Sequence, residues 1–148
     1  MKFVPANPSS YVYLNEFRAN NGNTNNWIIP SQDCTSGDGY NEWKYGLTGL
    51  YGYTAARGGA WARQKLPVRQ IELLAGTDDI YDNHGLDTDC GAEWQGPFRY
   101  QRAHIFKAFM DRFYAPNNFK ITDVQGIGHD STAMFASPPG KAAIFFAD

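Results

Sequence analysis

Three short runs with the residue pattern of strands occur along the chain, each bounded by polar or turn-forming residues. They cover residues 2–5 (KFVP), 68–74 and 119–124. Runs of this length, rich in Val, Ile, Leu and Phe and bounded by Gly, Pro or Asn, predict strands. Between the first two runs, residues 15–40 carry NNGNTNN at their centre. Asn and Gly at this density favour turns, so we expect a long loop there.

The segments between and after these runs have the spacing of helices. In FRYQRAHIFKAFMDRFY, apolar residues including Ala103, Phe106 and Phe113 recur on one face, and Pro97 should open the helix as its first residue. Three weaker helices are expected over residues 55–65, in a short stretch capped by Ser131, and over GKAAIFFA after Pro138 and Pro139.

The predicted order is strand, long excursion with a helix, strand, helix, strand and helix. Alternation of this kind predicts an α/β fold with about three parallel strands and helices packed on them. We expect one domain over residues 1–148, with a loop-rich covering segment at 15–54 and a strand–helix–strand–helix unit at 68–148. Strands that are buried on both faces need more partners than three strands supply, so we expect an amino-terminal half to be missing.

Composition excludes several classes of function. The 148 residues carry a formal net charge of −2 with scattered lysines and arginines, so nothing predicts binding to nucleic acid or to an anionic membrane. No apolar run approaches the roughly 18 residues of a transmembrane helix, and residues 1–14 lack the pattern of a signal peptide. Aromatic residues make up 16% of the chain, so many rings must be buried or line a groove.

Two of the apolar runs end in loops that carry candidate catalytic residues. IELLAGTDDIYD (Ile71–Asp82) presents Asp78 and Asp79, and GIGHDS presents His129. In open α/β sheets, ligands and catalytic groups lie at the carboxyl ends of the strands. A carboxylate that fixes the tautomer of a histidine makes it an effective general base, so these residues could be two members of a nucleophile–base–acid set. The alternative is that Asp79 caps a turn and His129 is an ordinary surface residue.

Both cysteines, Cys34 and Cys90, lie in polar loops rich in Gly and Asp. They are either free thiols or one disulfide. A disulfide between them would close a long loop and stabilise the fold by about 4 kcal/mol in the chain-entropy model. It would also indicate an oxidising compartment.

A second acidic stretch follows the Asp pair. Asp87, Asp89 and Glu93 alternate around Gly91 as oxygen ligands do in calcium loops, but the rest of that pattern is absent. A solvated polar loop is the favoured interpretation, a cation site is the alternative, and His84 is expected to be exposed. Three further polar residues should tie this loop down over the sheet, with substrate contact as the alternative: Gln95, Arg99 and Arg102.

Five segments that run nearly end to end carry a family resemblance: FVPANPSSYVYL, CTSGDGYNEWKYGL, IELLAGTDD, LDTDCGAEWQGPFRYQRA and GIGHDS. Together they resemble the carboxy-terminal half of a serine hydrolase of the α/β-hydrolase fold, of a type common among secreted fungal and bacterial proteins. The resemblance implies that Asp79 is the triad acid, with Asp78 as its rival, and that His129 is the base. It also implies a Cys34–Cys90 disulfide and an extracellular or periplasmic location. The residues it places at the wall of a pocket are Ser9, Ser10 and Tyr11.

The nucleophile of that family does not occur in this sequence. Neither the Gly-x-Ser-x-Gly elbow nor an HGGG-type oxyanion loop is found in the 148 residues. Ser131 is expected to cap a helix, and Ser9 and Ser10 to form a turn, rather than to replace the nucleophile. The resemblance therefore implies a fragment, inactive alone, of an enzyme that hydrolyses ester or amide bonds in small-molecule or polymer substrates without a cofactor or metal. The alternative is a non-catalytic α/β domain that binds a ligand or a cation.

Overall fold

A three-stranded parallel sheet forms the centre of the fold. The computed structural model describes residues 1–31, 34 and 39–145. The sheet has the order β1-β4-β5, and its strands are β1 (Lys2–Phe3), β4 (Gln70–Gly76) and β5 (Phe119–Val124). Both pairings are parallel, and β4 pairs with β5 along six successive residues. The predicted α/β class with three parallel strands is confirmed.

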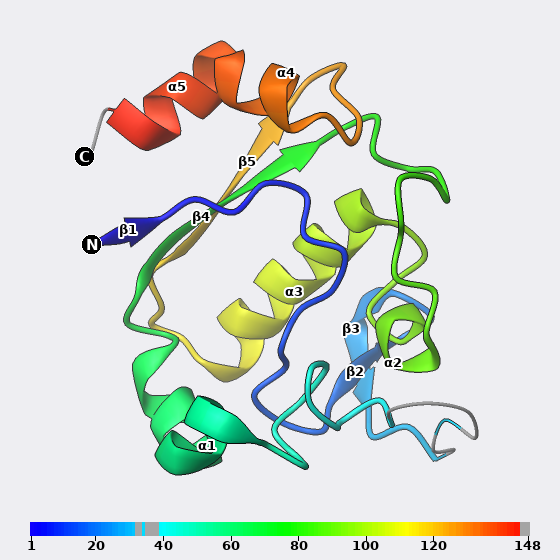
Figure 1. The fold of residues 1–148 in the computed structure, drawn as a ribbon. Helices are drawn as coiled ribbons and strands as arrows, with labels where there is room; N and C mark the ends of the chain where they lie inside the picture. Colours follow the sequence, from blue (N-terminus) through cyan, green and yellow to red (C-terminus); the bar gives the residue numbers. More distant parts are fainter. Residues whose placement is uncertain (32–33, 35–38, 146–148) are drawn as a thin grey trace.

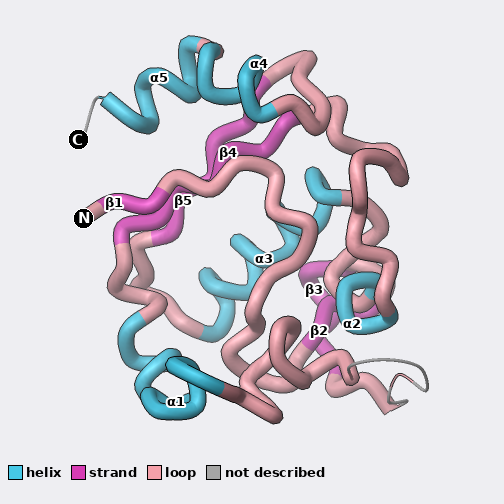
Figure 2. Tube along the Cα trace, viewed as in Figure 1, coloured by secondary structure: helices cyan, strands magenta, loops and turns pink. Residues whose placement is uncertain are grey.

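Helices and a hairpin surround this sheet (Figure 1). The hairpin joins β2 (Arg18–Asn20) to β3 (Asn23–Ile28) in antiparallel register. The helices are α1 (Gly52–Lys65), α2 (Cys90–Glu93), α3 (Arg99–Phe113), α4 (Ser131–Ala136) and α5 (Pro138–Phe145). Long loops connect several of these elements, notably from β4 to α2 (Figure 2).

Side chains that alternate along β4 pack into two separate cores. Leu73 and Ala75 lie in the larger cluster with Phe106 of α3, whereas Leu74 packs in a smaller one with Met134 of α4. Successive residues of a strand point to opposite faces, so α3 covers one face of the sheet, and α4 and α5 cover the other (Figure 1). This double coverage explains why β4 is apolar at consecutive positions.

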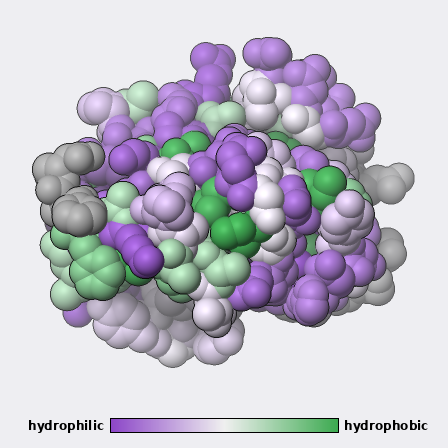
Figure 3. Space-filling view, turned by 90° about the horizontal axis from the view of Figure 1, so that it is seen from above, coloured by the Kyte–Doolittle hydropathy of each residue, from purple (hydrophilic) through white to green (hydrophobic). Residues whose placement is uncertain are grey.

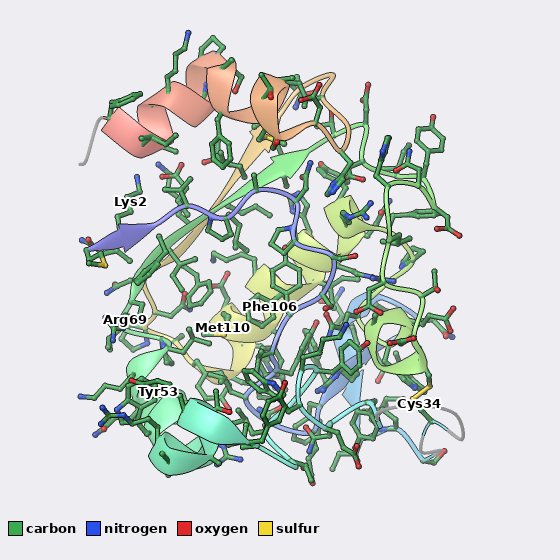
Figure 4. The ribbon with its side chains drawn as sticks, in the orientation of Figure 1. Lys2, Cys34, Tyr53, Arg69, Phe106 and Met110 are labelled. Carbon is green, nitrogen blue, oxygen red and sulfur yellow. A yellow bond between two sulfur atoms is a disulfide. The ribbon has the colours of Figure 1, made fainter. Side chains whose placement is uncertain are left out.

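The segment after β1 crosses α3 and completes the larger core (Figure 4). Tyr11 stacks on Phe106 with ring centroids 4.6 Å apart, and Tyr13 packs against Phe109 at 4.5 Å. Offset and tilted ring pairs of this kind add to the stability that their buried area provides. Part of the high aromatic content of the chain is therefore core, whereas other rings, such as those of Tyr51 and Tyr53, are exposed.

The structure corrects the predicted loop over residues 15–40. It contains the β2–β3 hairpin, where Trp27 and Ile28 supply strand propensity that the surrounding asparagines obscured. The turn of the hairpin uses Asn21 and Gly22, both at positive φ, which these residue types tolerate. Residues 32–33 and 35–38 of the expected covering segment lie outside the described residues.

Several predicted helix boundaries are also wrong. Helix α3 begins at Arg99 with Phe98 as its N-cap, so Pro97 precedes the helix instead of opening it. Asp130, not Ser131, caps α4, because its carboxylate accepts a hydrogen bond from the Ala133 N–H at 2.9 Å. The polar loop expected around Asp87, Asp89 and Glu93 contains the short helix α2. Residues 146–147 of the predicted last helix lie outside the described residues.

Two other elements are displaced from the predicted ranges. β4 starts at Gln70, because residues 66–69 form a turn that closes with an Arg69 N–H to Leu66 carbonyl bond of 3.1 Å. Helix α1 starts at Gly52 and kinks at Gly58, which has a φ of 77°. None of the helices in the described part of the chain combines the length and apolar character needed to cross a bilayer.

Candidate active site

The loops that follow β4 and β5 leave the sheet at the same edge and meet there (Figure 1). Asp79 lies in the first loop and His129 in the second, and the His129 Nδ1 atom is 3.0 Å from Asp79 Oδ2. The Asp79 side chain is 1% exposed and that of His129 is 33% exposed. The two residues predicted as acid and base are therefore in contact, with the carboxylate buried and the imidazole reaching the surface. Figure 3 looks onto this end of the molecule, where hydrophilic residues surround separate apolar patches.

A residue from the amino-terminal segment holds the two loops together. The Asn7 Oδ1 atom accepts a hydrogen bond from the Gly76 N–H at 2.8 Å, and its Nδ2 donates to the Gly128 carbonyl at 2.9 Å. Asn7 is buried and has a φ of 44°, a conformation that asparagine tolerates better than most residues. Sequence reasoning missed this role, because the amide pairs with positions 69 and 121 residues away along the chain.

Close backbone approach between the loops depends on the glycine at the end of β4. A Cβ on Gly76 would lie 2.2 Å from the Ile127 carbonyl oxygen, which is too close for any side chain. The Asp78 N–H donates to that same carbonyl at 3.1 Å, and the Thr77 Oγ accepts from the Gly126 N–H at 2.9 Å. Only glycine lets the acid loop lie directly against the histidine loop.

Arg99 fixes the other oxygen of the buried carboxylate. Its Nη1 is 3.3 Å from Asp79 Oδ1, and both side chains are 1% exposed. The same guanidinium donates to the Asn83 and His84 carbonyls, each at 3.1 Å. The prediction that Arg99 ties a loop down is confirmed, and the loop that it fixes is the one that carries Asp79.

His84 lies next to the candidate base. Its ring stacks on the His129 ring with centroids 6.0 Å apart, and its φ is 49°. The side chain is exposed, as expected, but its neighbour was not anticipated. Arg99 positions His84 through the backbone carbonyl, so one buried cation links Asp79 to the residue beside His129.

The remaining predicted site residues lie near the pair but do not touch His129. Asp78 is exposed, and its carboxylate accepts a hydrogen bond from the Thr77 hydroxyl at 3.2 Å. The Ser9 hydroxyl accepts from the Asp87 N–H at 2.7 Å, and Ser10 is half-buried in the adjacent turn. Tyr11 is buried, and burial above all raises the pKa of its phenol.

Gln95 and Arg102 hold the amino-terminal segment against the 87–96 loop. The Gln95 amide pairs with the backbone N–H and carbonyl of Tyr11 at 2.7 and 2.8 Å. Arg102 donates to the Ser9 and Asp87 carbonyls at 2.6 and 2.8 Å. The predicted role of both side chains in fixing this loop is confirmed.

The acidic stretch forms pairs within the protein. The Asp87 carboxylate lies 2.8 Å from the Lys44 ammonium, and the Tyr45 hydroxyl donates to both Asp87 and Asp89. Burial tends to raise the pKa of Asp87, but the hydrogen bond from Lys44 and its neighbours outweighs that effect and lowers it. Within the described residues, no three His, Cys, Asp or Glu side chains converge on a common point.

Cys34 and Cys90 form a disulfide, with Cα atoms 5.7 Å apart. Of the two open alternatives, free thiols are excluded. The bond joins the loop after β3 to the start of α2, two segments that lie 56 residues apart in the sequence.

The arrangement at the strand ends can move a proton. When the Asp79 carboxylate accepts the Nδ1–H of His129, the free electron pair of the imidazole lies on Nε2. This atom has no hydrogen-bond partner among the described residues. A neutral imidazole with an open Nε2 and a buried carboxylate on Nδ1 is the geometry of a general base.

Comparisons with known proteins relate the fold, rather than the site, to solved structures. The sequence matches no known family model and no curated protein. Two solved structures share its fold. One is LpqC, a poly(3-hydroxybutyrate) depolymerase from Bordetella parapertussis, with a TM-score of 0.57 and 25% identity over 90% of this chain. The other is poly(aspartic acid) hydrolase-1 from Sphingomonas sp. KT-1, with a TM-score of 0.55 and 21% identity over 90% of this chain.

The chain spans much less than the whole of either neighbour. It covers 37% of the length of the depolymerase and 41% of that of the poly(aspartic acid) hydrolase. Both neighbours are hydrolases, and the three parallel strands with helices on both faces match part of their structures. The fold is therefore α/β, a partial α/β-hydrolase fold.

Proposed function

We propose that this chain carries the acid and the base of a serine-hydrolase triad, with Asp79 as the acid and His129 as the base. In the proposed reaction, His129 Nε2 takes the proton of a serine hydroxyl as the serine oxygen attacks the carbonyl carbon of an ester or amide. The imidazolium then gives this proton to the leaving alcohol or amine. Asp79 keeps the Nδ1–H in place throughout and stabilises the positive ring.

The observation that carries the proposal is the contact between a buried carboxylate and a surface-reaching imidazole at neighbouring strand ends. The His129 Nδ1 to Asp79 Oδ2 distance is 3.0 Å, and the exposure of the two side chains differs strongly. A second Asp–His contact, His104 Nε2 to Asp123 Oδ1 at 2.8 Å, lacks this asymmetry because both side chains are more than a third exposed. Burial of the acid therefore distinguishes the candidate site from an ordinary surface pair.

The proposed nucleophile is a serine supplied by polypeptide that this sequence does not include. The 148 residues hold no Gly-x-Ser-x-Gly motif, and the chain matches only part of the length of two hydrolases. The exposed edge of β1 in the described sheet leaves room for further strands. We therefore expect the 148-residue chain by itself to lack triad turnover.

The proposed substrates are carboxylic esters or amides, in a small molecule or in a polymer. The two neighbours are named for a polyester and for poly(aspartic acid), which supports the polymer class of substrate. A Cys34–Cys90 disulfide supports an extracellular or periplasmic location. Residues 1–148 would act as one domain, with 15–54 as a loop-rich covering segment and 68–148 as the unit that carries Asp79 and His129.

Labelling with a fluorophosphonate probe tests the proposal, because such probes react with activated serines. The protein is compared as the 148-residue chain and as the longer product of the same reading frame. The longer product should be labelled, and should hydrolyse a p-nitrophenyl ester, only when Asp79 and His129 are both intact. His104→Ala is the matched control, since it removes a histidine that also contacts a carboxylate.

Two results would contradict the proposal. One is labelling of a serine within the 148-residue chain that disappears in His129→Ala. The other is a longer product whose hydrolysis is unaffected by His129→Ala, or is lost equally in His104→Ala.

A further inference from the structure

Helix α1 lies along an apolar groove that the candidate active site does not use. We call this the α1 groove; it is bounded by Leu14, Trp43, Leu47, Tyr53, Trp61 and Leu66. Its volume is about 220 Å³. No residue of α1 is buried, although the helix presents Trp61 and Ala62 to the groove and its C-cap Leu66 lines the groove as well. An apolar concavity of this kind is the usual form of a small-molecule site.

The rim of the α1 groove carries positive charge only. Arg57, Lys65 and Arg69 line it, and none of the described carboxylates lies within ion-pair distance of these three side chains. The sequence from Gly52 to Ile71 contains no Asp or Glu. This concentration of cations is local, because the whole chain has a net charge of −2. The rim is therefore complementary to an anion.

Arg57 is held at the rim by two aromatic rings. Its guanidinium carbon lies 5.3 Å from the Tyr53 ring centroid and 5.8 Å from that of Trp61. Stacking on ring faces leaves the N–H edge of a guanidinium free to bind a carboxylate. The same rings that form the groove wall thus place a donor at its mouth.

The α1 groove is far from the proposed catalytic pair. Tyr53 and Arg69 lie at the end of the molecule opposite the loops after β4 and β5 (Figure 4). None of Asp79, Arg99 and His129 lines the groove. A ligand bound there would not contact the proposed base, so the inference does not depend on the proposed function.

We propose that the α1 groove binds one dissolved molecule of a medium-chain aliphatic carboxylate. The hydrocarbon chain lies between Leu47, Trp61 and Leu66, and the carboxylate lies at the rim with Arg57, Lys65 and Arg69. The groove of about 220 Å³ has the volume of about seven water-sized groups. This fits a chain of roughly six to eight carbons.

The wild-type chain provides the first test. Octanoate, below its critical micelle concentration, is titrated by isothermal calorimetry and by tryptophan fluorescence, which Trp43 and Trp61 should report. We expect saturable binding with one site, and affinity that rises about fourfold per methylene from butanoate to octanoate. Octylammonium, with the same chain and the opposite charge, should bind more weakly than octanoate.

A charge variant provides the second test. Arg57→Gln combined with Arg69→Gln should weaken octanoate binding by about three- to tenfold, as expected for two exposed ion pairs. Arg112→Gln removes an exposed arginine outside the groove and should leave affinity unchanged. Far-ultraviolet circular dichroism checks that each variant is folded. If the double variant fails to fold, the chain-length and charge series on the wild-type protein still decide the question.

Four results would overturn the proposal. The first is an absence of saturable octanoate binding, and the second is an affinity that does not change from butanoate to octanoate. The third is equal affinity for octylammonium and octanoate. The fourth is a loss of octanoate affinity in Arg112→Gln as large as that in the double variant. Sedimentation velocity adds a further decisive outcome. If octanoate dissociates a dimer of the chain, the α1 groove is an interface between two copies and not a carboxylate site.

Discussion

Replacing Arg99 with methionine tests whether the acid loop depends on a buried ion pair. Methionine keeps much of the apolar stem but removes the guanidinium that lies 3.3 Å from Asp79 Oδ1. Both side chains are 1% exposed, so the variant leaves a buried carboxylate without its cation. It also removes donors from the Asn83 and His84 carbonyls.

The expected loss of stability is about 3–5 kcal/mol, the usual cost of removing one partner of a buried pair. Arg99 is the first residue of α3, where the helix dipole disfavours a positive charge, so the helix alone gives no reason for an arginine there. Asp79 supplies that reason. Arg112→Met, at an exposed position on the same helix, should change stability by about 0.5 kcal/mol or less.

Urea unfolding of a double-mutant cycle measures the effect. Arg99→Met, Asp79→Asn and the double variant are compared with the wild-type chain. The double variant should be more stable than the sum of the single losses predicts, by about 1–3 kcal/mol, because no charge is left buried without a partner. An Arg99→Met loss below about 1 kcal/mol, or strictly additive losses, would refute the importance of the pair.

Three further perturbations follow from other contacts. Replacing both Cys34 and Cys90 with serine should lower the free energy of unfolding by about 4 kcal/mol, since the disulfide spans 56 residues. An unchanged melting temperature of the wild-type protein after reduction would contradict this. Asn7→Ala should lower the free energy of unfolding by about 2–3 kcal/mol, because it leaves the buried Gly76 N–H unpaired. It should also abolish the low-field NMR signal of the His129 Nδ1 proton, and an unchanged signal would show that Asn7 does not position the loops. Burial tends to raise the pKa of Glu72, but the hydrogen bonds from Lys2 and Thr122 prevail and lower it from 4.5. The stability it contributes is thus present above that value and is lost as the pH falls below it. The free energy of unfolding should therefore fall less steeply at acid pH in Glu72→Gln than in the wild-type protein. The same dependence on pH in both proteins would count against this role of Glu72.

Much of the sheet was predictable because it depends on local patterns. The run at residues 119–124 forms β5 at the predicted bounds, and the apolar spacing of Ala103, Phe106 and Phe113 gives α3. The β2–β3 hairpin was missed because asparagines dominate its sequence, while the packing of Trp27 against Phe109 and Phe113 stabilises it. Contacts between residues far apart in one chain leave no periodic pattern in the sequence.

The sequence by itself predicted that Asp79 and His129 lie at the same edge of the sheet, because parallel strands bring their carboxyl ends together. It did not decide between Asp78 and Asp79. The structure separates them, since the turn after Gly76 buries one carboxylate against Arg99 and leaves its neighbour exposed. Only the tertiary structure showed that Asn7 holds the two loops together by hydrogen bonds, because that role depends on contacts between residues far apart in the chain. The succession of strands and helices along the chain follows from local sequence patterns, whereas the environment of a single side chain depends on every segment that packs around it.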